Sequence, residues 1–305
     1  MAETSHSPGV YSVAGNDPKR PVATTSKSRK QVSQESQPRT LIDAPAAFFA
    51  TTFVLAAPFY ILNALAYLEI LGGPNIAPIY IALFTITPIA SASLLTFRKR
   101  GKDGLKQLLR RIFDLERIGG YRWYGATLLL PLLIALLSLG GSTLFGVELP
   151  SSAAPLATLP LVLSFFFVLA AGEETGWMGY AFDPMQARYG ALRAGLGLGV
   201  VWAIWHVPFF VFMMPEAIVF TAQVVTLVST RVLIAWVYNN SGRSVFAATL
   251  FHAAGNALMI TLPDTSATGA LGPAISCGLV LSAAIVVTLL WGPQTLARYR
   301  FGNQV

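Results

Sequence analysis

The sequence is poor in charged residues. Asp, Glu, Lys and Arg make up 11% of its 305 residues, whereas 54% are hydrophobic and the mean hydropathy is +0.59. Soluble domains contain about 25% charged residues, so this composition excludes an ordinary soluble protein. Cysteine is also scarce. The single Cys277 excludes an internal disulfide and a cysteine-based metal site, and we interpret it as a packing residue.

Hydrophobic runs of membrane-spanning length recur from residue 45 onward. A helix needs about 20 apolar residues to cross about 30 Å of hydrocarbon. The sequence lacks the short alternating segments that are typical of transmembrane β-barrels. The predicted fold is therefore an all-α polytopic membrane protein with about eight transmembrane helices. The predicted spans are 45–68, 76–97, 123–145, 155–182, 191–213, 217–238, 245–262 and 271–292.

The first 40 residues have a different composition. They are rich in Ser, Thr, Gln, Pro, Lys and Arg, and they show no apolar periodicity that could build a core. We predict that residues 1–40 form a disordered basic cytoplasmic tail and that 41–305 form the membrane-embedded domain. The tail has no hydrophobic region of the kind found in a cleavable signal peptide. Its acidic residues Glu3, Asp17 and Glu35 disfavour an organellar presequence.

The basic residues alternate between the loops. The loops near 69–75, 146–154, 214–216 and 262–269 contain no Lys or Arg. Nearly all basic residues lie on the opposite side, in the tail, the loop 98–122, and Arg188, Arg193, Arg243, Arg298 and Arg300. The positive-inside rule then predicts a multi-pass protein with both termini in the cytoplasm, in the plasma membrane if the organism is a prokaryote. The net charge of +7 is thereby explained by topology, and no nucleic-acid partner is expected.

The long basic loop contains a helical pattern. Apolar residues recur at helical spacing opposite basic ones: Leu105, Leu108, Leu109, Ile112 and Phe113 against Lys106, Arg110 and Arg111. This pattern predicts a helix in the cytoplasmic interface with its basic face toward anionic membrane lipids. The alternative is a helix that packs against the bundle. Further on, Gly195 and Gly199 match a small-xxx-small pattern, which predicts close helix packing.

Polar residues interrupt three of the predicted spans. Glu173 and Glu174 end one hydrophobic run, although an acidic residue at bilayer depth costs about 3 kcal/mol and is usually functional. His206 lies at a distance from the turn-like stretch 188–190 that matches that of Glu173, so antiparallel helices would bring both to similar depth. Pro184 is expected to kink or end the first of these helices.

His252 and Asn256 are spaced i, i+4, so they share one face of the span 245–262. All these side chains can converge in one cavity in the cytoplasmic half of the bilayer. There a buried carboxylate can take a proton from water while a neutral histidine orients that water. An imidazole and a carboxamide on a neighbouring helix can donate hydrogen bonds to an oxyanion. The pattern indicates hydrolysis of an amide bond.

At these stretches the sequence resembles the CPBP family, which comprises membrane-embedded CAAX-type proteases and bacteriocin-processing or self-immunity (Abi) proteins. The family motif EExxxR corresponds to 173–178, the aromatic residue before histidine to Trp202 and His206, and HxxxN to His252 and Asn256. The resemblance covers about residues 95–262. One position departs from the motifs, because Met178 replaces the expected arginine.

The resemblance implies a role for each matching residue. Glu173 would activate water with His206, while His252 and Asn256 would form the oxyanion site. Glu174 would support this set. The four spans from 155–182 to 245–262 would form a four-helix catalytic core within 123–262. The implied activity is that of an intramembrane endopeptidase acting on a peptide or protein substrate, such as a prenylated C-terminal tail.

The absence of the motif arginine puts the role of Glu174 in doubt, since an arginine there would pair with a carboxylate. Arg231, alone within the span 217–238, is a candidate substitute cation, although a purely structural pairing is the simpler interpretation. Trp177, Tyr180 and Trp202 are interpreted as cavity lining or packing.

The cofactor requirement has two readings. Glu173, His206 and His252 could hold Zn²⁺ with a water molecule, and the family has been labelled as metalloproteases. The sequence contains no HExxH motif, and the same residues suffice for acid–base chemistry without a metal. We expect that no cofactor is required, with Zn²⁺ as the alternative.

Two other functions are compatible with the pattern. A non-proteolytic immunity or scaffold protein of the same family could retain the cavity, and Met178 favours this alternative. A proton-coupled transporter could use Glu173 and His206 as a relay. Such transporters usually contain inverted repeats, and the sequence shows no convincing internal repeat.

Overall fold

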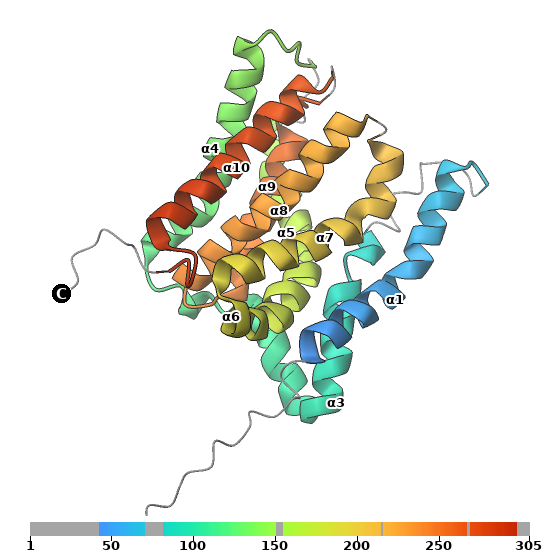
Figure 1. The fold of residues 1–305 in the computed structure, drawn as a ribbon, viewed down its shortest axis with the longest axis vertical. Helices are drawn as coiled ribbons and strands as arrows, with labels where there is room; N and C mark the ends of the chain where they lie inside the picture. Colours follow the sequence, from blue (N-terminus) through green and yellow to red (C-terminus); the bar gives the residue numbers. More distant parts are fainter. Residues whose placement is uncertain (1–42, 71–81, 151–154, 215, 267–268, 298–305) are drawn as a thin grey trace, which may run out of the picture. The chain divides into compact units, whose positions relative to one another are not determined.

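The computed structural model describes residues 43–70, 82–150, 155–214, 216–266 and 269–297, and the regular elements in these ranges are all helices (Figure 1). They belong to one compact unit, Arg39–Val305. The predicted tail 1–40 lies outside the described residues, so its disorder stays a prediction.

Within the described residues, six helical stretches are long and apolar enough to cross a membrane: Pro45–Tyr67, Arg122–Leu144, Leu156–Tyr189, Ala191–Met213, Ala217–Asn240 and Leu271–Trp291. They correspond to α1 (Asp43–Tyr67), α4 (Tyr121–Leu144), α5 (Leu159–Gly176) with its continuation, α7 (Ala191–Met213), α8 (Ala217–Asn240) and α10 (Leu271–Trp291). Large apolar side chains such as Leu161 and Val168 are exposed on the outside, which suits contact with lipid rather than water. The prediction of an all-α polytopic membrane protein is confirmed.

Two of the eight predicted spans differ in the structure. The predicted span 245–262 forms α9 (Val245–Thr261), which is apolar but has only 17 residues. The predicted span 76–97 begins outside the described residues, and the helix found there, α3 (Thr87–Arg110), continues into the basic loop. Its second half is charged, so α3 is not among the candidate spans. Hydropathy located the apolar start of α3 but not its polar continuation.

The basic half of α3 packs partly against the bundle. Gly101 has φ 62° and divides α3 into two helical parts. Leu108 is buried, whereas Lys106 and Arg110 are exposed. Leu109 also remains exposed, so the amphipathic pattern holds only in part. The described residues thus combine the two alternatives for this loop, with one face on the protein and basic side chains left outward.

Helices α5, α7, α8 and α9 form the middle of the bundle, with α4 and α10 on one side and α1 and α3 on the other (Figure 1). Within the middle group α5 packs against α9, and α7 packs against α8. A β-carbon on Gly199 would lie 2.9 Å from the Cα of Val228, so α7 and α8 are in close backbone contact there. The prediction of close packing at this glycine is confirmed.

Two further glycines bring α3 and α5 together beside the glutamate pair. A β-carbon on Gly172 would lie 2.7 Å from the carbonyl oxygen of Thr85, and one on Gly176 would lie 2.7 Å from Pro88 Cβ. Any larger residue would have to push these segments apart. The glycines around Glu173 and Glu174 therefore allow another segment of backbone to cover this part of α5.

The helix that carries the glutamates does not end at Pro184, which was one of the two outcomes predicted for this residue. It continues through a π-helical segment, η6 (Trp177–Phe182), into α6 (Asp183–Tyr189). Pro184 lies in the first turn of α6, where a missing N–H is tolerated most easily. A π-helical turn widens the backbone and is frequent at functional sites.

A sharp turn then joins α6 to α7. Gly190 adopts φ 80°, a conformation that favours glycine, and α7 begins at the next residue. The first amides of α7 are satisfied by the segment after α10, since Ala191 N–H donates to Gln294 O and Leu192 N–H to Pro293 O. This turn sets α5 and α7 antiparallel, as the sequence predicted.

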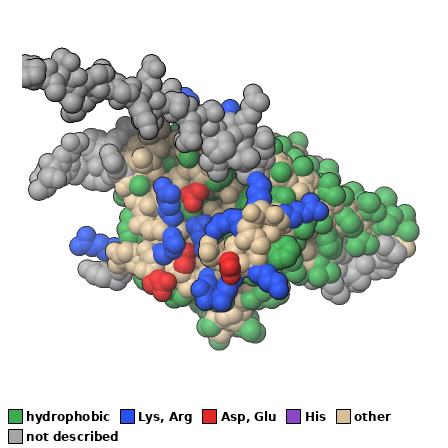
Figure 2. Space-filling model, turned by 90° about the horizontal axis from the view of Figure 1, so that it is seen from below, with side chains coloured by type: hydrophobic (Ala, Val, Ile, Leu, Met, Phe, Trp, Pro, Cys, Tyr) green, Lys and Arg blue, Asp and Glu red, His purple; other side chains and the backbone are tan. Residues whose placement is uncertain are grey.

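Lys and Arg side chains gather on the lower end of the bundle, shown in Figure 2. The residues that the loops contribute there include Arg110, Arg111, Arg117 and Arg243. The basic side chains at this end agree with the basic loops identified in the sequence.

Candidate functional site

Glu174 lies at the centre of a buried cluster of charged residues. Its side chain is fully buried, and Oε2 accepts a hydrogen bond of 2.6 Å from Arg231 Nη1 on α8. Its other oxygen, Oε1, is 2.8 Å from Nδ1 of His252 on α9. Both oxygens are therefore occupied, and one carboxylate ties three helices together. A buried charge needs such partners, because its removal from water costs several kcal/mol. This cost is comparable with the net free energy of unfolding of a whole domain.

Glu173 is held by a different helix. Its side chain is 4% exposed, and Oε2 accepts a hydrogen bond of 2.7 Å from Trp202 Nε1 on α7. The second carboxylate oxygen of Glu173 makes no hydrogen bond within the described part of the chain. Glu173 thus has one oxygen fixed and one available, whereas both oxygens of Glu174 are engaged.

Trp202 organises the polar side chains around it. The centroid of its ring lies 5.1 Å from that of His206 and 5.3 Å from that of His252. The guanidinium of Arg231 lies 4.1 Å from the centroid of the same indole, a cation–π distance. Trp202 was interpreted from the sequence as lining or packing. That interpretation was incomplete, because the indole also positions the Glu173 carboxylate.

Each histidine has one ring nitrogen fixed by a neighbour. His206 Nδ1 lies 2.9 Å from the carbonyl oxygen of Trp202, and a carbonyl oxygen only accepts, so we assign the proton to Nδ1. The same reasoning assigns a proton to His252 Nδ1, which faces the Glu174 carboxylate. In both rings Nε2 is left for another group. His206 is half-buried, and His252 is 5% exposed.

Asn256 completes the set on α9, one turn after His252. It is half-buried, and its carboxamide makes no hydrogen bond among the residues that the structure describes. The predicted residues from three separate stretches therefore come together on α5, α7 and α9. The expected similarity in depth of Glu173 and His206 is confirmed, because Glu173 bonds to a residue one turn before His206.

The missing motif arginine has a counterpart in the structure. Met178 is fully buried within the π-helical segment. The cation beside Glu174 comes instead from Arg231 on α8, which is also fully buried. Glu174 therefore has a cationic partner, although Met178 replaces the arginine of the motif. The sequence signal was that Arg231 is the single charged residue in the span 217–238.

The zinc alternative on Glu173, His206 and His252 stays a prediction. In the described ranges, no group of three or more His, Cys, Asp or Glu side chains is arranged to hold a metal ion. Both oxygens of Glu174 are already bonded, and the guanidinium of Arg231 places a positive charge inside the cluster. Such a charge opposes the binding of a second cation nearby.

An apolar cavity of about 710 Å³ lies beside the glutamate pair, between α3, α5 and α9. Ala171 and Gly172, which directly precede Glu173, form part of its wall. The remaining lining is almost entirely apolar and includes Ile86, Ile89, Phe113, Phe167, Phe246 and Leu250. A cavity of this size and polarity is suited to a hydrophobic group of drug-like or lipid-like size.

Comparisons with known proteins identify the same region. A family model described as Type II CAAX prenyl endopeptidase Rce1-like matches residues 155–258, which contain all the side chains of the cluster. CAAX prenyl protease 2 from Methanococcus maripaludis is 27% identical over 224 residues, which cover 68% of this chain and 81% of that protein. Residues 155–258 of this chain thus match the Rce1-like family of CAAX-type endopeptidases, and the protein is a membrane-embedded protease.

Proposed function

We propose that this protease hydrolyses its peptide bond with a water molecule activated by Glu173 and His206. The observation that carries the proposal is the fixed position of Glu173, whose Oε2 is held by Trp202, and the Trp202 ring lies beside both His206 and His252. The free oxygen of Glu173 and Nε2 of His206 can both accept a hydrogen bond from one water. Two acceptors on one water orient its lone pair for attack.

The reaction then proceeds in balanced steps. Glu173 takes one proton from water, and the resulting hydroxide adds to the carbonyl carbon of the substrate. His252 Nε2, when that ring carries both protons, and the Asn256 carboxamide donate hydrogen bonds to the oxyanion. A doubly protonated His252 makes the cluster neutral, with Glu173 and Glu174 balancing Arg231 and His252. Glu173 finally returns its proton to the leaving amine as the C–N bond breaks.

We assign Glu174 and Arg231 positioning roles in this reaction. Glu174 fixes the orientation of His252 through Nδ1. Arg231 neutralises Glu174 and packs on Trp202. We propose that no metal takes part, because the Arg231 guanidinium already places a positive charge inside the cluster.

We propose a prenylated C-terminal tail as the substrate. The printed name of the archaeal relative, CAAX prenyl protease 2, supports this class. The apolar cavity beside Gly172 supports it independently, since a prenyl chain is apolar and would lie next to Glu173. The end of the bundle rich in Lys and Arg is proposed to face the cytoplasm.

The experiment compares purified protein in lipid vesicles with its Glu173→Ala variant on a peptide that ends in a CAAX box. One peptide carries a farnesyl group on its cysteine and the other carries none. We expect cleavage of the farnesylated peptide by the wild-type protein alone. Terminal-peptide mass spectrometry of membranes from native cells would then identify physiological substrates. Equal cleavage of both peptides would contradict the prenyl assignment. Retained cleavage by Glu173→Ala would contradict the mechanism, and a Glu173→Ala variant that keeps the cellular phenotype would favour a scaffold role.

A further inference from the structure

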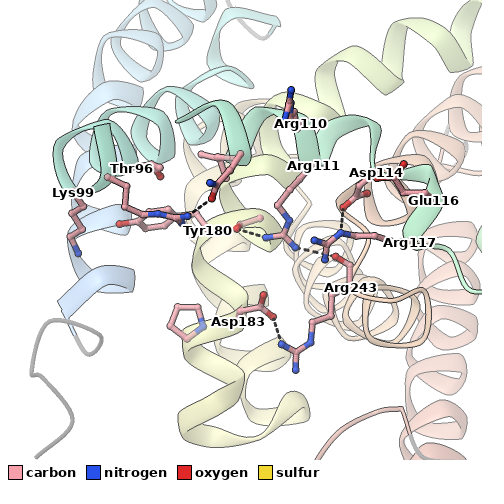
Figure 3. Close-up of a pocket in the computed structure, with 15 residues that line it drawn as sticks. Thr96, Lys99, Arg110, Arg111, Asp114, Glu116, Arg117, Tyr180, Asp183 and Arg243 are labelled. Atoms are coloured by element: carbon pink, nitrogen blue, oxygen red, sulfur yellow. Dashed lines mark hydrogen bonds and ion pairs between the residues drawn. The ribbon is translucent and has the colours of Figure 1, made fainter. Parts of the chain in front are cut away.

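A second, basic pocket lies at the end of the bundle, separate from the buried cluster (Figure 3). Its volume is about 810 Å³, and it is formed by the basic half of α3, the segments that follow it, and residues of η6 and α6. Six basic and three acidic residues line it: Lys99, Arg100, Arg110, Arg111, Arg117 and Arg243, with Asp114, Glu116 and Asp183. Positive charge is therefore in excess.

Two of the three acidic residues are already engaged by the protein. Asp114 accepts hydrogen bonds from Ser244 Oγ at 2.6 Å and from Phe246 N–H at 3.1 Å, so it caps the start of α9. Asp183 accepts a hydrogen bond of 3.0 Å from the Tyr238 hydroxyl and lies 3.8 Å from Arg243. These carboxylates hold the walls of the pocket together and do not neutralise all its cations.

Arg111 is fixed in the wall by neutral acceptors. Its guanidinium donates to Gly179 O at 2.7 Å, to the Tyr238 hydroxyl at 2.6 Å and to Arg243 O at 3.0 Å. In Figure 3 its side chain extends into the pocket, whereas that of Arg110 points away. The sequence left open whether this basic face lies toward lipid or packs against the bundle. Arg111 follows the second alternative, since its guanidinium bonds to the protein from the start of η3 (Arg111–Phe113).

Arg100 is held in a shallow cradle. A β-carbon on Gly104 would collide with the side chain of Arg100, so the absence of that carbon lets Arg100 lie across the helix. There its Nη2 donates to Gln107 Oε1 at 2.5 Å. Among the described residues, neither Arg100 nor Arg111 forms an ion pair with a carboxylate. Two preoriented guanidinium groups are thus available to an anion.

Two helices connect this pocket with the proposed catalytic groups. Gly179 in its wall lies five residues beyond Glu174, which corresponds to about 7 Å along a helix. On α9, Val245 is bonded to the pocket residue Asp114 and precedes His252 by seven residues, or about 10 Å. Along the helix axes, Gly179 and Val245 thus lie about 7–10 Å from Glu174 and His252.

We propose that this pocket binds the C-terminal carboxylate of the substrate, chiefly through Arg100 and Arg111. The inference rests on the proposed function. In a CAAX box the cysteine is the fourth residue from the C-terminus. A bond cleaved after that cysteine therefore lies at most three residues from the terminal carboxylate, or about 10 Å in an extended chain. This length matches the separation between the catalytic groups and the pocket.

The test uses two farnesylated peptides that differ only in a free C-terminal carboxylate or a C-terminal amide. With protein in neutral phosphatidylcholine vesicles, we expect wild type to cleave the acid with a kcat/KM about tenfold higher than the amide, mainly through KM. Arg100→Gln should lose most of this preference, because kcat/KM for the acid falls toward the value for the amide. Gly104→Ala should reduce the preference through displacement of Arg100. The matched control is Arg193→Gln, which removes an exposed arginine that does not line the pocket.

The outcomes separate this inference from the proposed function. Failure of wild type to cleave either peptide would overturn the proposed function and the inference with it. Equal cleavage of acid and amide by wild type, or a full preference in Arg100→Gln, would overturn the carboxylate site alone. If Arg100→Gln lowered cleavage of both peptides equally, and only in vesicles containing anionic lipid, the pocket would bind lipid headgroups and the inference would be wrong. Cleavage of the amide also reports that each variant is folded.

Discussion

The buried cluster around Glu174 and the basic pocket near Arg111 are two charged regions that both include residues of the helical run from α5 to α6, yet they differ in how their charges are matched. Around Glu174, each carboxylate oxygen has a buried partner, one of them the fully buried Arg231. In the basic pocket, cations outnumber carboxylates, and several side chains are exposed. Unpaired charge is costly in an apolar interior but cheap near water.

This difference predicts that stability depends on the charges of the buried cluster, whereas ligand binding depends on the charges of the basic pocket. Removal of one charge from the cluster leaves its partner buried and alone. When a charge is removed from the pocket, water takes its place, so the stability of the fold should change little. Binding of an anionic ligand should become weaker. The following predictions test that contrast, from the largest effect to the smallest.

The largest effect is expected for Glu173→Gln. The amide keeps the size of the side chain and can still accept the Trp202 hydrogen bond, but it cannot take a proton from water. We expect cleavage of the farnesylated peptide to fall by about 10²–10⁴-fold, the usual contribution of a general base. The steady-state rate measures this. Glu216→Gln, which alters an exposed glutamate, is the control and should keep full activity.

Arg231→Met should have the largest effect on stability. It leaves Glu174 fully buried without its cation, which costs about 3–5 kcal/mol. Thermal unfolding in detergent micelles measures the loss. Addition of Met178→Arg to this variant restores the family motif on the helix of Glu174, and we expect partial recovery of stability and activity. An unchanged melting temperature in Arg231→Met would show that the pair is not needed for the fold.

Trp202→Phe should reduce catalysis without a comparable loss of stability. It keeps an aromatic ring under Arg231 but removes the N–H that holds Glu173 at 2.7 Å. Loss of one positioning hydrogen bond to a charged group predicts a decrease in kcat of about tenfold, with KM near the wild-type value. Trp123→Phe, on α4, controls for the loss of an indole elsewhere. A larger change in KM than in kcat would indicate that Trp202 contacts substrate instead.

Arg117→Gln should scarcely affect stability, in contrast to Arg231→Met. Arg117 is 51% exposed, and its Nε lies 3.6 Å from Asp114. A partly exposed pair of this kind contributes less than about 1 kcal/mol. Asp114 keeps its hydrogen bonds from Ser244 and the start of α9. A fall in melting temperature as large as that of Arg231→Met would break the proposed contrast between the two regions.

Chelation of metals should have no effect. The proposed mechanism uses the carboxylate and histidine side chains without a cation other than Arg231. Activity after treatment with a strong chelator should therefore equal that of untreated protein, and the purified protein should lack stoichiometric zinc by elemental analysis. A loss that added Zn²⁺ specifically reverses would support the zinc alternative on Glu173, His206 and His252.

Much of the candidate site could be predicted from the sequence because its residues are tied to helix spacing. The i, i+4 relation places His252 and Asn256 on one face, and the turn near Gly190 sets Glu173 and His206 at one depth. The partners across helices were harder to predict. Helices that are apolar on all sides carry no signal for their rotation, so the bonds of Trp202 and Arg231 required the structure.

The basic pocket shows a second limit. Amphipathic spacing in 105–113 identified a basic face but not what lies against it. The close passage of α3 depends on Gly172 and Gly176, whose effect becomes visible only with the opposing Thr85 and Pro88. Composition likewise gave the correct fold class, while the extent of α3 and the short α9 depended on where polar residues begin.

The π-helical segment Trp177–Phe182 also has a meaning for the history of this protein. A π-helical turn is equivalent to one residue inserted into an α-helix, and one residue corresponds to about 100° of rotation. If one residue between Trp177 and Phe182 were deleted, Asp183 would rotate by about 100° about the helix axis relative to Glu174. Asp183 would then point away from Tyr238, whose hydroxyl donates a hydrogen bond to it in the structure. A change of one codon could thus alter the rotation of the basic end about the helix axis relative to Glu173 and Glu174.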